Sequence, residues 1–244
     1  MKGELPGATG RLISLEVIWD GIEDRSQYPF SIPALAGVGE ISFDQPVTFL
    51  VGENGSGKST VLEAVAVAAG FNAEGGSRNL SLVTRSSHSQ LHQHLVLAWR
   101  GTPRRGFFLR AESFYGVASE YERLPGSPLP SYHAISHGEA FLKVVEGHFL
   151  GRGLYLMDEP ESALSVLGQL QLLLHMDRIT AAGGQFVIAS HSPILTAFPG
   201  ATVYQLADGG ISEIEYTDSE TYRLTKSFLD NPEGVLRTLL ATPK

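Results

Sequence analysis

The chain has 244 residues, of which 43% are hydrophobic and 18% are charged. This balance predicts a packed globular core and excludes general disorder. The formal net charge of −8 removes the easy electrostatic argument for nucleic-acid binding without forbidding it, and the absence of cysteine excludes disulfides and thiolate metal sites.

The length allows one large α/β domain or two small ones. No apolar run approaches the roughly 18 residues that a membrane-spanning helix needs. Residues 1–21 are too polar and too often interrupted for a signal peptide. We therefore expect a soluble, cytoplasmic protein with no direct membrane insertion.

The first half of the chain is predicted to hold short strands around one helix. Apolar segments predict strands at residues 11–19, 41–43, 47–51, 95–100 and 106–112. Apolar residues recur at helical spacing within residues 61–68 and predict a helix. Residues 70–90 are small and polar, and they predict a connecting loop. The last two strands flank a short charged turn, which we expect to be a hairpin tip.

The second half alternates helices with buried strands. Helices are expected at residues 113–123, 137–153, 162–184 and in the last stretch of the chain. A proline-rich segment at 124–131 separates the first two helices. Residues 153–158 and 185–190 predict buried strands, and residues 203–216 predict a hairpin.

This alternation predicts a mainly parallel sheet wrapped by helices. In such sheets, ligands bind beyond the carboxyl ends of the strands. Three of the predicted strands end in polar residues: the segment from Gly52 onward, Asp158–Glu159, and Ser190–His191. We expect these three strand ends to form one site.

The first of these strand ends fits the pattern G-x-x-x-x-G-K-[ST] from Gly52 to Ser59, between a predicted strand and a predicted helix. That pattern is a phosphate-binding loop, whose backbone N–H groups and helix N-terminus attract a polyphosphate. Lys58 is expected to reach the β- and γ-phosphates, and the Ser59 hydroxyl to bind Mg²⁺. The residues assigned to nucleotide binding are Gly52, Glu53, Asn54, Gly55, Ser56, Gly57, Lys58, Ser59 and Thr60.

The second strand end reads "LYLMDEPESAL", with two adjacent carboxylates after four apolar residues. Asp158 is placed to bind Mg²⁺, usually through water, and Glu159 to polarise the attacking water. Because two buried acids repel each other unless a cation compensates them, the pair supports a metal–nucleotide role. The alternative is an acidic cluster that starts a helix at Pro160.

The third strand end, "ASHSP", offers His191 as a hydrogen-bond partner for the γ-phosphate or the water. The alternative is a histidine that caps a helix beginning at Pro193. Further upstream, Ser136, His137 and Gly138 lead into an amphipathic helix and can present N–H groups and a hydroxyl to a phosphate. Ser136 with Glu139 also fits a capping box, and both roles are compatible.

The order GENGSGKST, ISHGEA, LYLMDEPESAL and SHSP resembles the ABC-type ATPase superfamily over roughly residues 11–210. Within it, "YPFSIPALAG", "FDQPVTFLVGENGSGKST" and "GFFLRAESFYGVA" resemble a soluble group of predicted AAA family ATPases with ABC-like heads. That group is related to chromosome-maintenance and break-repair ATPases.

The resemblance implies the fold, the cofactors and the assembly. The fold would be an α/β P-loop NTPase with a mainly parallel sheet, an antiparallel β subdomain and a small helical signature subdomain. Residues 1–244 would form one domain, divided into an N-terminal lobe (1–111), the signature subdomain (112–150) and a C-terminal lobe (151–244). It further implies ATP and Mg²⁺ as cofactors and ATP hydrolysis within an ATP-dependent head-to-tail homodimer. "SHGEA" would act as the signature that completes the partner's site.

The chain departs from the family pattern at several positions. The signature reads His137–Gly138–Glu139, and Glu112 stands where the family has its coupling glutamine. Ser165 replaces a frequent aspartate. Tyr28 or Phe30 could take the place of the family's adenine-stacking aromatic residue, or either could be a core residue.

Three other functions share these motifs. A transporter nucleotide-binding subunit would need a membrane partner, and the missing glutamine disfavours it. A nucleic-acid-associated repair or defence ATPase is disfavoured by the charge of −8 and by the lack of a coiled-coil insertion. A non-catalytic nucleotide sensor would lack the base, but Glu159 is present.

Two polar clusters remain. The histidines His88, His92 and His94 could in principle bind zinc, but a solvated polar stretch is the favoured interpretation. The arginines Arg100, Arg104, Arg105 and Arg110 surround the predicted turn at 101–104, and we interpret them as a charged hairpin tip rather than a nucleic-acid contact.

Overall fold

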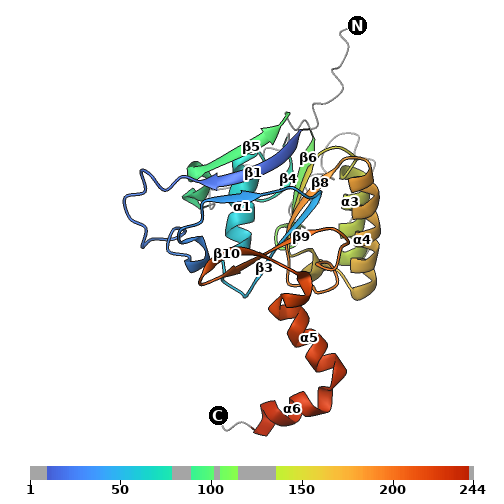
Figure 1. The fold of residues 1–244 in the computed structure, drawn as a ribbon. Helices are drawn as coiled ribbons and strands as arrows, with labels where there is room; N and C mark the ends of the chain where they lie inside the picture. The colour runs from blue at the N-terminus through green and yellow to red at the C-terminus, as the bar shows by residue number, and fades with distance from the viewer. Residues whose placement is uncertain (1–9, 79–88, 102–104, 115–135, 242–244) are drawn as a thin grey trace.

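The computed structural model describes residues 10–78, 89–101, 105–114 and 136–241, which form a mixed α/β protein with two sheets (Figure 1). His88, Arg104, the proline-rich segment at 124–131 and most of the predicted helix at 113–123 lie outside these ranges.

The larger sheet has seven strands in the order β10-β9-β3-β8-β7-β6-β4. Its five central strands run parallel, and β4 and β10 pair antiparallel at the two edges. The strands are β3 (Val47–Gly52), β4 (Gly76–Ser77), β6 (Gly106–Arg110), β7 (Leu154–Asp158), β8 (Gln185–Ala189), β9 (Thr202–Ala207) and β10 (Gly210–Ile214). Strands β3, β7 and β8 are buried at every residue, which agrees with their mostly apolar sequences. The prediction of a mainly parallel sheet is confirmed.

A second, antiparallel sheet has the order β2-β1-β5. Its strands are β1 (Arg11–Val17), β2 (Glu40–Ser42) and β5 (Leu95–Arg100). The predicted hairpin between residues 95–100 and 106–112 is wrong, because β5 pairs with β1 whereas β6 pairs with β7 and β4. The burial pattern explains the separation: β5 alternates along its length, whereas the centre of β6 is fully buried.

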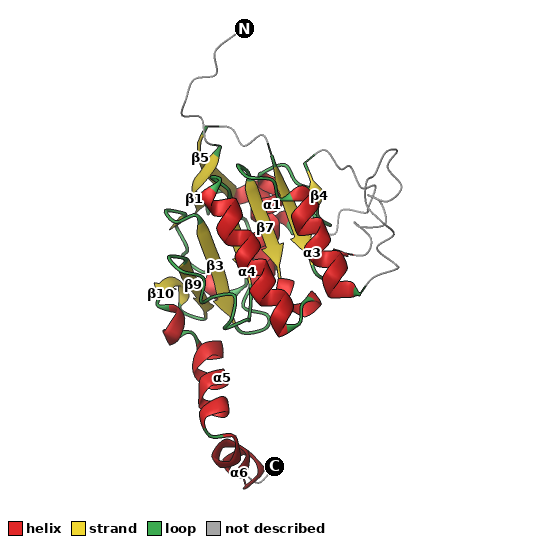
Figure 2. Ribbon diagram, turned by 90° about the vertical axis from the view of Figure 1, so that its right-hand side faces the viewer, coloured by secondary structure: helices red, strands yellow, loops and turns green. Residues whose placement is uncertain are grey.

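Helices cover both faces of the larger sheet. Helix α1 (Lys58–Ala68) lies between the two sheets, and α3 (His137–His148) and α4 (Val166–Ala181) pack on the opposite face (Figures 1 and 2). The larger sheet has a hydrophobic core on each face, and successive residues of β3 point to opposite faces. Phe49 packs in the core with α3 and α4, and Leu50 packs in the core with α1. Phe149 stacks on Tyr155 with ring centroids 4.6 Å apart in the first of these cores.

The boundaries of α4 differ from the prediction at its start. Residues Pro160–Ala163 form a separate 3₁₀ turn (η4), and the Ser165 side chain accepts a hydrogen bond from the Gly168 N–H (3.1 Å) to cap the helix. Its end is as predicted, since Gly183 follows with a positive φ of 88°. The other 3₁₀ turns are η1 (Pro33–Leu35), η2 (Gln90–His94) and η5 (Tyr216–Asp218).

The predicted hairpin at 203–216 is formed by β9 and β10, and the predicted C-terminal helices are α5 (Glu220–Asp230) and α6 (Pro232–Ala241). These two helices extend away from the two-sheet body, and neither contains a buried residue (Figure 2). Within the described ranges, no helix has the length and apolarity needed to cross a membrane.

Candidate active site

Three strand ends meet at one edge of the larger sheet. Strand β8 lies between β3 and β7, and all three run parallel, so their carboxyl ends lie at the same edge. The backbone continues this pairing past the strands, since the Ser190 N–H donates to the Leu50 carbonyl (3.1 Å) and the Glu159 N–H to the Ala189 carbonyl (2.9 Å). The sheet order therefore brings together the three polar segments predicted to form one site.

The loop after β3 requires its glycines. Gly57, directly before α1, has a left-handed φ of 99°, and a Cβ there would lie 2.8 Å from Ile32 Cγ2. A Cβ on Gly52 would lie 2.5 Å from the Leu206 carbonyl oxygen. Gly55 also has a positive φ of 82°, but a Cβ there would meet nothing within 4 Å. The loop is thus tightly packed at both ends and open in the middle, where a phosphate can approach backbone N–H groups.

Lys58 is the buried cation of this loop. The residue is only 4% exposed, and its Nζ donates to the Gly52 carbonyl (3.1 Å) and the Glu53 carbonyl (2.9 Å). Burial lowers the pKa of Lys58, and the nearby Glu159 and Asp158 carboxylates oppose that shift. The ammonium group is therefore held at the mouth of the loop by weak carbonyl acceptors that a phosphate can replace.

Two buried polar atoms at the loop lack hydrogen-bond partners within the described part of the chain: Ser56 Oγ and His191 Nε2. An open cavity of about 500 Å³ lies at the loop, and its lining includes Gly52, Asn54, His191 and Leu224 of α5. Because buried polar groups normally have partners, the His191 imidazole that lines this cavity fits a bound polar ligand such as a nucleoside triphosphate.

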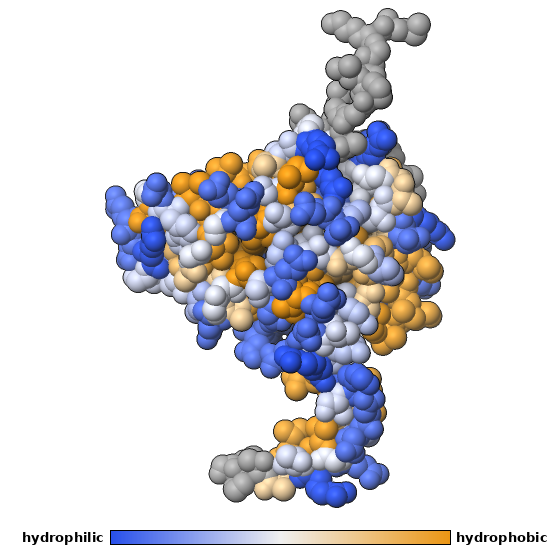
Figure 3. Space-filling model, in the orientation of Figure 1, coloured by the Kyte–Doolittle hydropathy of each residue, from blue (hydrophilic) through white to orange (hydrophobic). Residues whose placement is uncertain are grey.

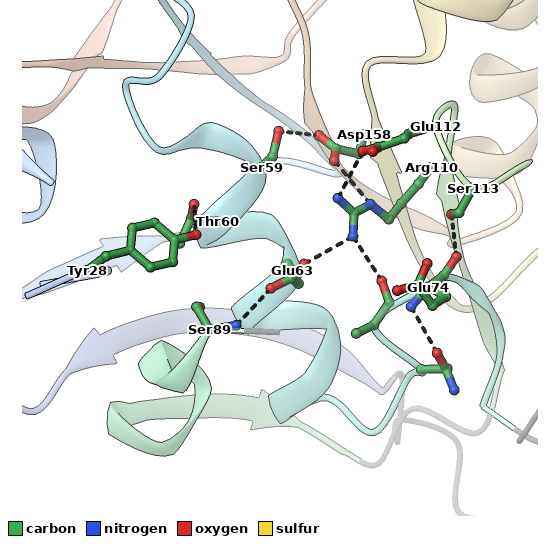
Figure 4. Close-up of polar contacts among 12 residues, drawn as sticks. Tyr28, Ser59, Thr60, Glu63, Glu74, Ser89, Arg110, Glu112, Ser113 and Asp158 are labelled. Carbon is green, nitrogen blue, oxygen red and sulfur yellow. Dashed lines mark hydrogen bonds and ion pairs between the residues drawn. The ribbon is translucent and has the colours of Figure 1, made fainter. Parts of the chain in front are cut away.

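A hydroxyl and a carboxylate lie together next to the loop. Ser59 Oγ donates to Asp158 Oδ1 over 2.8 Å (Figure 4). Burial raises the pKa of Asp158, while the Ser59 hydrogen bond and Arg110 lower it. Two hard oxygen ligands on neighbouring elements fit Mg²⁺, which takes one or two protein oxygens together with phosphates and water.

Glu159 follows Asp158 in a strained backbone conformation, with φ 47° and ψ 52°. Its Oε1 lies 3.7 Å from His191 Nε2, and its side chain is 41% exposed. Burial, followed by Lys58, lowers the pKa of His191, although Glu159 opposes the shift. The site therefore holds a carboxylate beside a neutral imidazole. The alternative of a helix at Pro193 is wrong, because residues 193–197 form turns.

Sequence reasoning missed Glu161, which holds the His191 segment in place. Its carboxylate accepts hydrogen bonds from the Ser190 hydroxyl (2.9 Å) and from the His191 N–H. Burial raises the pKa of Glu161, whereas these hydrogen bonds lower it. Its position in "DEPES", two residues beyond the predicted base, is the signal that could have indicated a role.

Sequence reasoning also misplaced Arg110. Its side chain is only 15% exposed and lies among Glu63, Asp158 and Glu112 (Figure 4), so it belongs to the site and not to a charged hairpin tip. Arg100 and Arg105, in contrast, are exposed. The signal that could have located Arg110 is its place at the carboxyl end of a parallel strand.

The start of α3 is capped as predicted. The Ser136 N–H donates to Glu139 Oε2 (3.1 Å), and Ser136 Oγ accepts from the Glu139 N–H (3.4 Å), which completes a capping box. His137 contacts the Phe114 ring, with centroids 5.4 Å apart. Within the described chain, Ser136, His137 and Gly138 do not line the cavity at the phosphate loop.

The two candidate adenine-stacking residues have different environments. Phe30 is 8% exposed and packs edge-on against Trp19 and His94, so it is a core residue. Tyr28 is 65% exposed, and its hydroxyl lies 3.1 Å from Thr60 Oγ1 (Figure 4). Tyr28 is therefore the better placed of the two to meet a nucleotide base.

The remaining polar candidates also have assigned places. The Glu112 side chain is 89% exposed and lies 3.7 Å from Arg110 Nη2. His92 Nδ1 lies 2.9 Å from the Ser89 carbonyl, and His94 packs on Phe30. In the part of the chain that the structure describes, no three or more histidine or carboxylate side chains lie together as a zinc site would need.

A family model described as an AAA domain matches residues 36–98. The matched segment contains the whole phosphate loop and helix α1. The match therefore supports the resemblance to nucleotide-binding P-loop ATPases in this part of the chain. A comparison with curated proteins finds no match.

Several solved structures have a similar arrangement. The SMC head domain from Thermotoga maritima is 17% identical, with 84% of this chain and 99% of that chain covered and a TM-score of 0.49. An ATP-binding cassette of an ABC transporter in its ADP conformation is 16% identical, with 95% and 100% covered and a TM-score of 0.49. An ATP-binding subunit of an ABC transporter is 17% identical, with 85% and 91% covered and a TM-score of 0.48. Because these TM-scores lie below 0.5, no functional statement about this chain follows from them.

Proposed function

We propose that this chain binds ATP with Mg²⁺ and hydrolyses it as a cytoplasmic ATPase of the ABC type. The observation that carries the proposal is the convergence of the phosphate loop, Asp158–Glu159 and His191 at the carboxyl ends of three adjacent parallel strands. The resemblance of the four motifs and the AAA-domain match over residues 36–98 support it.

The phosphate loop would bind the polyphosphate. Its backbone N–H groups and the N-terminus of α1 provide positive potential, and Lys58 would move from the Gly52 and Glu53 carbonyls to the β- and γ-phosphates. Tyr28, exposed beside Thr60, would contact the base.

Ser59 Oγ and Asp158 Oδ1 would hold Mg²⁺, directly or through water. The ion, when bound, neutralises charge on the β- and γ-phosphate oxygens. Asp158 is prepared for this role because its oxygen already faces the Ser59 hydroxyl.

Glu159 would act as the general base. A water oxygen attacks the γ-phosphorus, the bond from that phosphorus to the bridging oxygen of ADP breaks, and the water proton passes to the Glu159 carboxylate. His191, neutral because burial lowers its pKa, would orient the γ-phosphate or the water. Glu161 would keep His191 in place through its backbone.

A second copy of the chain would complete the site. Ser136, His137 and Gly138 start a capped helix whose N-terminus is not part of the cavity in its own chain. In a head-to-tail homodimer this N-terminus would meet the γ-phosphate on the partner's loop, so one twofold contact would build two sites.

The hydrolysis role is tested with Glu159→Gln. This change should retain ATP binding and slow phosphate release by roughly 10²–10⁴-fold, because it removes only the general base. Lys58→Ala should instead weaken ATP binding itself, measured by titration calorimetry. Glu213→Gln on the exposed edge strand β10 is the matched control and should behave as wild type. Undiminished turnover of Glu159→Gln would refute the assignment.

The shared site is tested by mixing two inactive variants, Lys58→Ala and Gly138→Asp. A mixed dimer holds one site with both residues intact, so part of the activity should return. Light scattering of Glu159→Gln with MgATP should give the mass of a dimer. A monomeric mass together with no recovery on mixing would rule out the shared site while leaving the nucleotide site untouched.

A further inference from the structure

A buried arginine lies next to the proposed Mg²⁺ ligands and has no part in the roles assigned to the other site residues. Arg110 is the last residue of β6, and it is paired in register with Asp158, the last residue of β7. Its side chain is 15% exposed. A charged group at this depth needs partners, and each partner indicates what the arginine does.

The outer part of the guanidinium is anchored to α1 and the loop that follows it. Arg110 Nη1 donates to Glu63 Oε2 (3.0 Å) and to the Ala73 carbonyl (3.2 Å). The Glu63 side chain is also 15% exposed, and its second oxygen accepts from the Ser89 N–H (3.2 Å). Arg110 is therefore held by the Glu63 carboxylate, which is itself fixed by the Ser89 N–H (Figure 4).

The inner part of the guanidinium faces Asp158. Arg110 Nε lies 3.5 Å from Asp158 Oδ2, while Ser59 Oγ donates to Oδ1 over 2.8 Å. The two carboxylate oxygens thus have different partners, because Oδ1 accepts a hydrogen bond from Ser59 and Oδ2 forms an ion pair with Arg110. This arrangement opposes rotation of the carboxylate and keeps Oδ1 turned toward Ser59, where the ion would bind (Figure 4).

Arg110 has two opposing effects on the proposed site: its positive charge repels Mg²⁺, and its contact with Asp158 orients a ligand of the ion. An isolated guanidinium beside the site would repel Mg²⁺ and weaken its binding. Here Glu63 lies 3.0 Å from the guanidinium in an equally buried position and offsets its charge. What remains is the orientation of Asp158, which favours binding of the ion.

We propose that Arg110 is a positioning residue that holds Asp158 in the orientation that receives Mg²⁺, and that Glu63 holds Arg110 in place. This inference rests on the proposed function, since it assumes that Asp158 binds the ion. Partners of this kind, one shell beyond the metal, affect metal affinity by 10–100-fold in other proteins.

The test measures Mg²⁺ dependence separately from nucleotide affinity. A fluorescent ADP analogue is titrated into each protein in EDTA, and Mg²⁺ is then titrated at a fixed analogue concentration. Arg110→Gln should keep the affinity measured in EDTA and raise the half-saturating Mg²⁺ concentration by about 10–100-fold. Arg110→Lys, which keeps the charge but not the fork of donors, and Glu63→Gln should both give smaller increases.

Arg100→Gln is the matched control, because it changes the same residue type at an exposed position on the other sheet. It should bind Mg²⁺ as wild type. Thermal melting identifies any variant that fails to fold. If Arg110→Gln fails to fold, the Mg²⁺ titrations of Arg110→Lys and Glu63→Gln test the inference in its place.

Two results would overturn the inference. The first is an unchanged Mg²⁺ titration for the folded Arg110 variants. The second is an equal loss of affinity in EDTA and in Mg²⁺, which indicates a purely structural ion pair. If wild-type protein itself shows no Mg²⁺ dependence, the proposed function fails, and this inference fails with it. A wild-type dependence that Arg110→Gln retains contradicts only the role of Arg110.

Discussion

Glu161 shows how one partly buried carboxylate holds a neighbouring segment of the candidate site in place. It accepts hydrogen bonds from the Ser190 hydroxyl and the His191 N–H, and these fix the backbone that carries the imidazole. The arrangement carries an energetic cost, because burial raises the pKa of Glu161 above the 4.5 of an exposed glutamate. Precise placement of His191 and stability at neutral pH are therefore in opposition at this residue.

The pH dependence of stability tests that opposition. The folded state binds the Glu161 proton more tightly than the unfolded chain does. The free energy of unfolding of wild type therefore increases as pH falls through the folded-state pKa toward 4.5. The Glu161→Gln variant has no carboxyl group at this position, so its free energy of unfolding lacks this increase. The difference in free energy of unfolding, variant minus wild type, should be most positive at about pH 8 and decline on acidification. Urea unfolding across this range measures it.

Glu213→Gln, at an exposed position of β10, is the control for a glutamate-to-glutamine change outside the site. A Glu161→Gln difference that grows on acidification would show that the carboxylate is favoured, and not disfavoured, in the folded protein.

At the scale of elements, side chains of the larger sheet hydrogen-bond to the backbone of the smaller one, and Gln185 does so most completely. Gln185, at the start of β8, is 3% exposed. The Leu12 N–H donates to its Oε1 (2.9 Å), and its Nε2 donates to the Leu12 carbonyl (2.8 Å). The amide thus pairs with β1 as a neighbouring strand would, near the irregular register between Leu12 and Ser14.

Gln185→Ala should destabilise the protein strongly. It would leave a buried N–H and a buried carbonyl of Leu12 without their partners, each at a cost of about 1–3 kcal/mol, so the free energy of unfolding should fall by about 2–6 kcal/mol. Chemical denaturation measures the loss. Gln171→Ala on the exposed face of α4 is the control and should stay within about 0.5 kcal/mol of wild type. A loss below about 1 kcal/mol for Gln185→Ala would mean that the Gln185 amide contributes little to holding the two sheets together.

At the scale of the whole molecule, the two C-terminal helices extend away from the body, although Leu224 of α5 lines the cavity at the phosphate loop. Their large apolar side chains are exposed, and apolar surface is visible on this arm in Figure 3. The exposed residues are Leu224, Phe228, Leu229, Leu236, Leu239 and Leu240. Helices of 10 and 11 residues gain little stability from propensity alone. Within the described chain, α6 is thus supported mainly by its junction with α5.

Removing residues 232–244 should therefore leave the body intact. No residue of α6 is buried, so the melting temperature should change by less than about 2–4 °C, which corresponds to about 1 kcal/mol for a chain of this size. Phe186→Ala, in the core between the larger sheet and α3–α4, should instead cost about 3–5 kcal/mol and shows that the assay is sensitive. A truncated chain that melts as early as Phe186→Ala would show that α6 supports the fold.

Local pattern in the sequence was enough to predict the phosphate loop, the acids after β7, the capping box at Ser136 and the hairpin of β9 and β10. Each depends on residues that are close in the chain, and parallel strands bring their carboxyl ends to one edge. These positions could therefore be assigned before any coordinates, whereas their roles in ATP hydrolysis remain predictions.

Only the tertiary structure decided which distant groups pair. Gln185 and Leu12 are 173 residues apart, and Arg110 and Glu63 are 47 apart. It separated β5 from β6 into different sheets, buried Phe30 and left Tyr28 exposed. The physical reason is that periodicity encodes which face of an element is buried, while the partner across the sheet depends on strand order, which short-range spacing does not specify.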